Sequence, residues 1–316
     1  MATPLVPAAA DLPAVVATER ISATGRPTPA FREALRRIPD LRNAGAVTAV
    51  WAQTAVIVTA AVRIDRWWAW VAAFLLMGPT HARFAALMHE AAHRLLFSNR
   101  RINDTVGRWL LGFPTFTPID SYRRGHMAHH REEFGPDEPD IPLYRGYPIS
   151  RASFRRKLVR DATGRTGTKL MRGLFRALRS SDPSTRFQAR AILGCQVVLL
   201  ALAAAAGHPL VYVVLWLGPF LTVWRVINRL RSVAEHGGMV QSRDRRQTTH
   251  SVRQHPLARA LLVPAHIGWH LAHHVDPGIP MARLPRFHRE LRRAGYLDDH
   301  LEYPGYLALW RRLSSG

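Results

Sequence analysis

Four apolar stretches constrain the fold of this chain more than any other feature. Residues 44–62 carry no charged side chain over 19 positions, which is long enough for a helix to cross a bilayer. Residues 67–88 are helical in pattern and begin with an aromatic cluster typical of the membrane interface. Residues 191–207 and 210–226 form a second pair, although each of these could instead be a buried soluble helix. Taken as two hairpins, the stretches predict an all-α integral membrane protein with four transmembrane helices.

The distribution of basic residues predicts the orientation. The net charge is +22, and residues 145–190 hold 13 arginines and lysines but only two acids. The positive-inside rule therefore places the N-terminus, residues 100–190 and the C-terminal third in the cytoplasm. Such a charge suits an anionic membrane surface or nucleic acid. The arginine clusters carry no recognisable nucleic-acid-binding motif, so we expect no nucleic acid partner.

The rest of the chain suggests three parts. We expect a cytoplasmic N-terminal tail in residues 1–43, a membrane domain in 44–295 and a cytoplasmic C-terminal tail in 296–316. Residues 1–29 are rich in Ala, Pro and Thr, which predicts disorder. Residues 31–42 could form a short amphipathic helix on the membrane surface or a solvated helix. The apolar run at 109–119 is too short to cross a membrane, so it is expected to be re-entrant or interfacial.

Histidines are concentrated in short boxes. The sequences HEAAH, HMAHH, AEHGG and HLAHH contain, in order, His89, His93, His126, His129, His130, His236, His270, His273 and His274. On a helix, positions i, i+3 and i+4 share one face. Each box with several histidines therefore directs two or three imidazoles at one point. Neutral imidazole binds Fe, Cu, Ni and Zn. Eight or nine such ligands are too many for one zinc and suit two metal ions.

The topology is consistent with one shared site. An even number of crossings separates the boxes, which places all of them on the cytoplasmic side, in a helical cap. Each ligating imidazole should donate its other N–H to a nearby acceptor. The candidates near the boxes are Glu90, Asp137, Asp140, Glu235 and Asp276. His266 lies four residues before the last box and is expected to support the site or the structure rather than bind metal.

In order and spacing, these motifs resemble the integral-membrane fatty acid desaturase family, whose relatives include hydroxylases, ketolases and decarboxylases. The sequences HHREEFGPDEPD, RSVAEHGG and HLAHHVDPGIPMARLPRFHREL are similar to the family's second box, extra-ligand element and third box. The resemblance spans about residues 45–295. It implies a non-haem centre of two iron ions just under the membrane surface, with O2 as oxidant and the nine box histidines as ligands.

The resemblance implies desaturation of a membrane lipid or acyl chain, and breaking an unactivated C–H bond would require such a metal centre. Electrons should come from a separate ferredoxin-, rubredoxin- or cytochrome-like donor, since the sequence has no haem, iron–sulfur or dinucleotide motif. We expect a bacterial inner-membrane protein with its active site and both termini cytoplasmic. A hydroxylase, ketolase or 1-alkene-forming decarboxylase stays open on the same scaffold. More distant alternatives are a membrane zinc protease that uses HEAAH and a non-enzymatic metal-binding protein.

Overall fold

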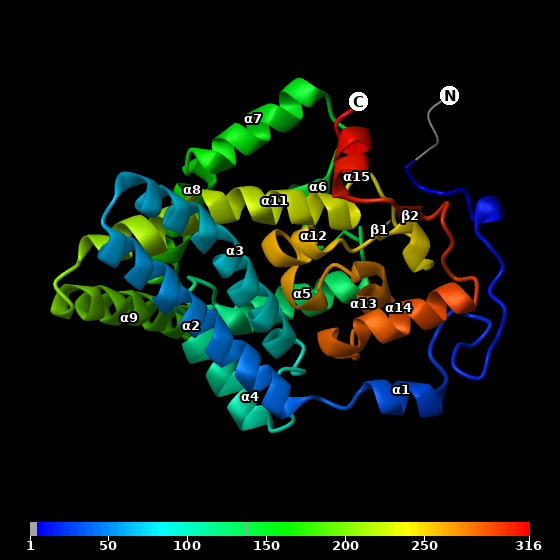
Figure 1. Ribbon diagram of the computed structural model, residues 1–316. Coiled ribbons are helices and arrows are strands. Elements are labelled where there is room, and N and C mark those ends of the chain that lie inside the picture. The colour runs from blue at the N-terminus through cyan, green and yellow to red at the C-terminus, as the bar shows by residue number, and fades with distance from the viewer. Residues whose placement is uncertain (1–4, 137) are drawn as a thin grey trace. The chain divides into compact units, whose positions relative to one another are not determined.

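The computed structural model describes residues 5–136 and 138–316, and its described part is mostly helical (Figure 1). The chain forms two compact units, each built from segments that are distant in sequence. Unit 1 comprises Met1–Pro39, Arg124–Phe154 and Leu230–Gly316, and unit 2 comprises Asp40–Arg123 and Arg155–Arg229. Three of the four points of division fall inside helices, namely α5 (Ile119–Arg131), α7 (Arg151–Ala162) and α11 (Val223–His236). The units do not follow the expected division into two tails and a membrane domain, which stays a prediction.

Four helices of the described chain are long and apolar enough to cross a membrane. They are α2 (Asp40–Ile64), α3 (Trp67–Ala92), α9 (Pro183–Ala205) and the helical stretch Tyr212–His236. This confirms the four apolar spans and, with the family relationship given below, an integral membrane protein. The third span begins eight residues before the expected start (191 against 183) because Pro183 and the Asp182 cap start its helix. The fourth span continues past the expected end to His236.

The fourth span is irregular near its beginning. It consists of a π-helical turn η3 (Tyr212–Leu217), the short helix α10 (Gly218–Leu221) and α11 (Val223–His236). Pro219 lacks a backbone N–H, which interrupts the regular ladder of an α-helix. The run expected to be re-entrant or interfacial begins inside a second π-helical turn, η2 (Gly107–Gly112), and is not among the candidate spans.

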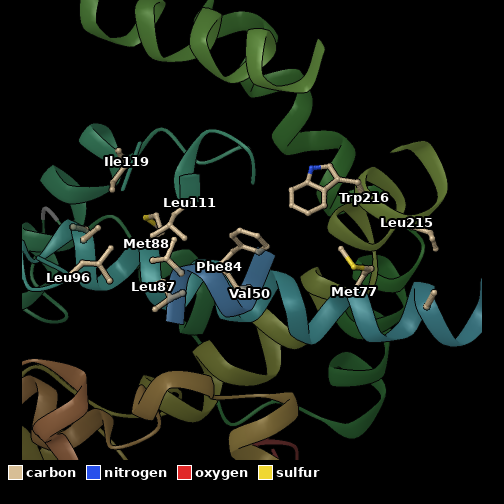
Figure 2. Packing of buried hydrophobic residues seen from close by; sticks show 14 of the residues in the cluster. Val50, Met77, Phe84, Leu87, Met88, Leu96, Leu111, Ile119, Leu215 and Trp216 are labelled. Atoms are coloured by element: carbon tan, nitrogen blue, oxygen red, sulfur yellow. The ribbon is translucent and has the colours of Figure 1, made fainter. Parts of the chain in front are cut away.

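Unit 2 packs its spans through aromatic and small residues. Helices α2 and α3, dark blue to cyan in Figure 1, run antiparallel after a two-residue connection and contact each other along their length. Phe84 packs edge-on against both Trp51 and Trp216, with ring centroids 5.0 and 5.6 Å away. Figure 2 shows Phe84 and Trp216 among the buried residues of this core. A Cβ on Gly78 would lie 2.3 Å from Val223 Cγ1. A small residue is therefore required for this close approach, as is common between membrane helices.

A buried ion pair ties two further segments of unit 2 together. Asp161 on α7 (Arg151–Ala162) is fully buried and accepts hydrogen bonds from the Arg229 guanidinium of α11. Thr166 at the start of α8 (Arg165–Ala177) also donates to Asp161. Unit 2 is completed by α4 (Arg100–Val106), whose N-cap Asn99 accepts from two backbone N–H groups.

Unit 1 consists of short helices and loops that frame the second and third histidine boxes. Its remaining elements are η1 (Ala9–Asp11), α1 (Pro29–Leu35), α5 (Ile119–Arg131), α6 (Ile141–Tyr144), η4 (Arg245–Gln247), β1 (Ser251–Val252), α12 (Pro256–Leu261), η5 (Pro264–His266), α13 (His270–Val275), η6 (Met281–Arg283), α14 (Leu284–Arg293), β2 (Glu302–Tyr303) and α15 (Tyr306–Leu313). The strands β1 and β2 form a short parallel pair.

The N-terminal segment is ordered, so the expectation of disorder is wrong for residues 5–29. Ile21 is fully buried and pairs with Pro27 in an isolated bridge. The Val16 N–H donates to the Ala294 carbonyl at the end of α14. Composition predicted a tail because the segment lacks periodicity, whereas its order comes from contacts with residues almost 300 positions away. The amphipathic helix expected at 31–42 is shorter and ends at Leu35.

Candidate metal centre

Helices α5 and α13 (Figure 1) carry the second and third histidine boxes, and their histidine side chains meet in unit 1. On α5, His126 and His130 are one helical turn apart, and their Nε2 atoms are 3.1 Å apart. The His130 Nε2 atom is also 3.0 Å from the Nε2 atom of His273 on α13. All three imidazoles are buried. They form a first trio of ring nitrogens from two distant boxes.

A second trio forms beside the first. The Nε2 atom of His270 is 3.1 Å from that of His236 at the end of α11 and 3.0 Å from that of His274 on α13. Ligand nitrogens of His129, His236 and His274 also lie within 4.8 Å of one another. All seven box histidines of unit 1 therefore lie in one buried cluster.

The spacing within each trio is that of metal ligands. Nitrogens that bind one ion at about 2.1 Å and at right angles lie about 3.0 Å apart. Imidazoles packed this closely must either share protons or bind a cation, because their lone pairs converge. The donors are nitrogen atoms in a buried setting, which suits borderline metals such as Fe, Cu, Ni or Zn. The ring nitrogens of unit 1 therefore fit a metal site.

In three of these histidines, the second ring nitrogen contacts an oxygen acceptor. His236 Nδ1 is 2.9 Å from the Thr248 carbonyl oxygen. The Nδ1 atom of His129 contacts a carboxylate oxygen of Glu138, and that of His274 contacts Glu133. An N–H donated from Nδ1 leaves Nε2 as the free base, which is the tautomer a metal ligand needs.

The sequence reasoning missed both glutamates that contact the second ring nitrogens. Glu133 and Glu138 follow the second box by three and eight residues, and both carboxylates are buried. Their position immediately after HMAHH was the available signal. The Thr248 carbonyl could not be found in this way, because any residue supplies a backbone oxygen.

Burial sets the protonation of the cluster. Burial and the neighbouring imidazoles lower the pKa of His270 and His274 well below the usual value, so both rings are neutral. Burial also opposes protonation of His129, but Glu138 outweighs it and raises the pKa of that ring. Burial raises the pKa of Glu133, although Arg245 opposes the shift. Neutral imidazoles are the form that binds metal.

Arg245 connects the Glu133 carboxylate to the second box. Its Nη1 atom is 2.6 Å from Glu133 Oε1, and its Nη2 donates to the His130 carbonyl at 2.9 Å. One side chain thus holds the end of α5 and the acceptor of His274 in fixed relation. The sequence did not indicate this role, because arginines are abundant throughout the chain.

The first box lies in unit 2. His89 is buried in the last turn of α3, and His93 is the C-cap residue of that helix. Their ring centroids are 4.7 Å apart. The two imidazoles can therefore act as a pair. Their convergence with the boxes of unit 1 stays a prediction.

The candidate supporting residues have different positions. Glu235 pairs with Arg231 at 3.0 Å, and its carboxylate is 3.6 Å from His270 Nδ1. Asp276 accepts a bidentate pair of hydrogen bonds from Arg32 on α1. Burial raises the pKa of Asp140, while the charge of His129 opposes the shift.

The remaining candidate supporting residues are Glu90, His266 and Asp137. Glu90 is buried on α3 in unit 2. The ring of His266 lies 5.2 Å from that of Trp269 rather than among the box histidines. Asp137 lies outside the described residues.

Comparison with known proteins identifies the family. The fatty acid desaturase family profile matches residues 65–305, which is more than half of the chain. Dihydrorhizobitoxine desaturase from Bradyrhizobium elkanii is 26% identical over 268 residues, covering 79% of this chain and 76% of that protein. Delta(12) fatty acid desaturases from Mortierella isabellina and Mortierella alpina are 30% identical over 93 residues, covering 27% of this chain and 22% of each relative. The chain belongs to the fatty acid desaturase family and is a desaturase-like oxidoreductase.

Proposed function

We propose that this protein is an O2-dependent di-iron desaturase that inserts a C=C bond into the acyl chain of a membrane lipid. The observation that carries the proposal is the pair of imidazole trios with Nε2 atoms about 3 Å apart. Family membership supports an oxidoreductase and an acyl substrate. The proposed ligands are His89, His93, His126, His129, His130, His236, His270, His273 and His274.

The electrons and protons of the proposed desaturation must balance. Two C–H bonds of the substrate break and one C=C bond forms, which releases two electrons and two protons. Reduction of O2 to two waters consumes four of each, so two more electrons come from an external carrier and two protons come from solvent. Two bound iron ions would supply the O2 activation that no side chain can provide. The described residues of the protein hold and orient those ions.

The second-nitrogen contacts explain how the residues perform this task. Glu133, Glu138 and the Thr248 carbonyl fix the tautomer and the orientation of His274, His129 and His236. These three histidines are themselves buried. We further propose that the four spans form two hairpins, with the boxes in a cap on the cytoplasmic side of a bacterial inner membrane.

Metal analysis and product analysis test the proposal together. Purified protein should contain about two irons per chain, and His130→Ala and His274→Ala should each lose metal. A host that expresses the protein should accumulate an internal double bond in its acyl chains, and the His130→Ala host should not. One tightly held zinc would refute the di-iron centre. An alcohol or a terminal alkene would support the hydroxylase or decarboxylase alternative.

The comparisons favour one further candidate substrate. The relative aligned over most of both chains is named for dihydrorhizobitoxine, whereas the shorter matches are named for fatty acids. Product profiling should therefore cover the small-molecule fraction as well as the lipids. A new double bond confined to that fraction would replace the acyl substrate with a small molecule and leave the desaturase chemistry intact.

A further inference from the structure

A polar cavity of about 1170 Å³ lies within unit 1, next to the histidine cluster. Its walls come mainly from four places: the N-terminal segment around Arg26, residues 130–133 at the end of α5, the loop around Arg243, and the segment Val275–Gly278 that follows the third box. His130 and His274 form part of its lining. The cavity therefore gives access to the proposed metal centre through two of its histidines.

The lining is basic. It contains five arginines and three acids. Arg32 is paired with Asp276, and Arg245 is paired with Glu133. These ion pairs neutralise two of the five arginines, so the net charge of the cavity lining comes from the other charged residues.

Three arginines remain to attract an anion. Arg26, Arg131 and Arg243 are exposed, and none of them forms an ion pair with a carboxylate among the described residues. The third acid, Glu132, is exposed and accepts a hydrogen bond from Gln241 at 3.3 Å. Exposed charges of one sign around a concave surface attract a partner of opposite charge and accelerate its association.

A continuous polar connection leads inward from this surface. Arg245 is partly exposed at the cavity and contacts Glu133, which in turn contacts His274. The same guanidinium donates to the carbonyl of His130. A partner seated in the cavity would thus be joined to both imidazole trios through contacts present in the structure.

We propose that Arg26, Arg131 and Arg243 form the docking site for the acidic surface of a small ferredoxin-type electron carrier. The inference rests on the proposed function, which requires two electrons from outside. The carrier is oxidised twice, one electron at a time, and those electrons complete the reduction of O2 described above. The five arginines and three acids of the lining favour a charged partner over an acyl chain. Charge complementarity selects an acidic protein as the occupant.

The test uses full-length, iron-loaded protein in phosphatidylcholine nanodiscs, with an acidic plant-type [2Fe–2S] ferredoxin, its reductase and NADPH. The dock variant is Arg26→Gln, Arg131→Gln, Arg243→Gln. The matched control replaces three exposed arginines of α8 and the segment after it: Arg165→Gln, Arg172→Gln, Arg179→Gln. Product formation driven by dithionite is measured on the same preparations as the reference for each variant.

The expected result is a rise of at least about fivefold in KM for ferredoxin in the dock variant, because three rim charges are lost. The wild-type KM should itself rise with salt, since exposed charges are screened over about 10 Å at 0.1 M ionic strength. The α8 control should keep the wild-type KM.

Several outcomes would overturn the docking site. One is an unchanged ferredoxin KM in the dock variant, and another is an equal rise in the α8 control. Product formation with dithionite but none with ferredoxin would also refute it, while the proposed function would stand. A rise in KM for the lipid substrate alone would assign the cavity to the anionic head of the substrate. Iron-loaded protein that forms no product with either reductant would instead refute the proposed function.

Discussion

Glu133→Gln is the most direct test of how unit 1 organises its metal centre. The Glu133 side chain is completely buried, and its carboxylate contacts both His274 Nδ1 and the Arg245 guanidinium. Glutamine has nearly the same shape but no charge. The substitution therefore changes the strength of the contact to His274 while preserving the packing of the site.

The magnitude follows from the type of hydrogen bond that is lost. A hydrogen bond to a charged group contributes about 1.5–3 kcal/mol, and a neutral one contributes about 0.5–1.5 kcal/mol. The loss at His274 is therefore about 1–1.5 kcal/mol, or roughly a tenfold weaker hold on the metal, since 1.4 kcal/mol is a factor of ten. This agrees with the roughly 10- to 100-fold effect typical of residues that orient metal ligands.

The assay is the iron content of purified protein after equilibration with graded concentrations of a chelator of known Fe(II) affinity. Glu132→Gln is the matched control, because the adjacent Glu132 is exposed and carries the same charge. We expect Glu133→Gln to lose iron at about a tenfold lower chelator concentration than the control. Equal retention in the two variants would show that Glu133 does not orient a ligand.

Two further predictions concern stability in detergent. Asp161→Asn removes the charged partner of the buried Arg229. The free energy of unfolding should fall by about 3–5 kcal/mol, and the thermal midpoint by roughly 6–20 °C. The exposed Glu19→Gln variant should keep the wild-type midpoint, and a wild-type midpoint for Asp161→Asn would contradict the reasoning. Burial lowers the pKa of His250 to about 4, although its hydrogen bond to the Gly237 carbonyl opposes the shift. As the pH falls, His250 is therefore protonated first in the unfolded chain, near the ordinary histidine pKa of 6.5. The free energy of unfolding decreases by about 3 kcal/mol between pH 6.5 and 4. His250→Gln should have a weaker pH dependence of the midpoint over this interval than wild type, and identical pH profiles would refute the assignment.

Sequence periodicity and composition predicted the membrane spans because their cause is local. A run of about 20 apolar residues is sufficient for a span, and all four runs became helices of suitable length. Their ends were less accurate. The third helix begins at Pro183, since the Asp182 carboxylate caps two backbone N–H groups there. This cap lies in a polar stretch that a hydropathy pattern cannot register.

The box spacing also predicted which imidazoles of unit 1 share a face, because i, i+3 and i+4 are fixed by helix geometry. The residues that support them were predicted less well. Asp276 lies two residues after His274, yet it pairs with Arg32 on α1. Glu133 reaches His274 from a different box. Such contacts depend on which loops meet in space, and local motifs and spacing do not reveal that.

The arrangement in unit 1 also bears on the zinc-protease alternative. That mechanism needs one zinc, held by His89 and His93 and one further ligand. It assigns no role to the seven buried imidazoles of unit 1, six of which bring their Nε2 atoms together in two trios. Without a cation, the Nε2 atoms of each trio could only share protons among themselves, and a ring nitrogen that found no partner would cost about 1–3 kcal/mol in desolvation. A chain whose only metal chemistry were at HEAAH would have no reason to bear that cost, whereas a two-metal centre satisfies these nitrogens.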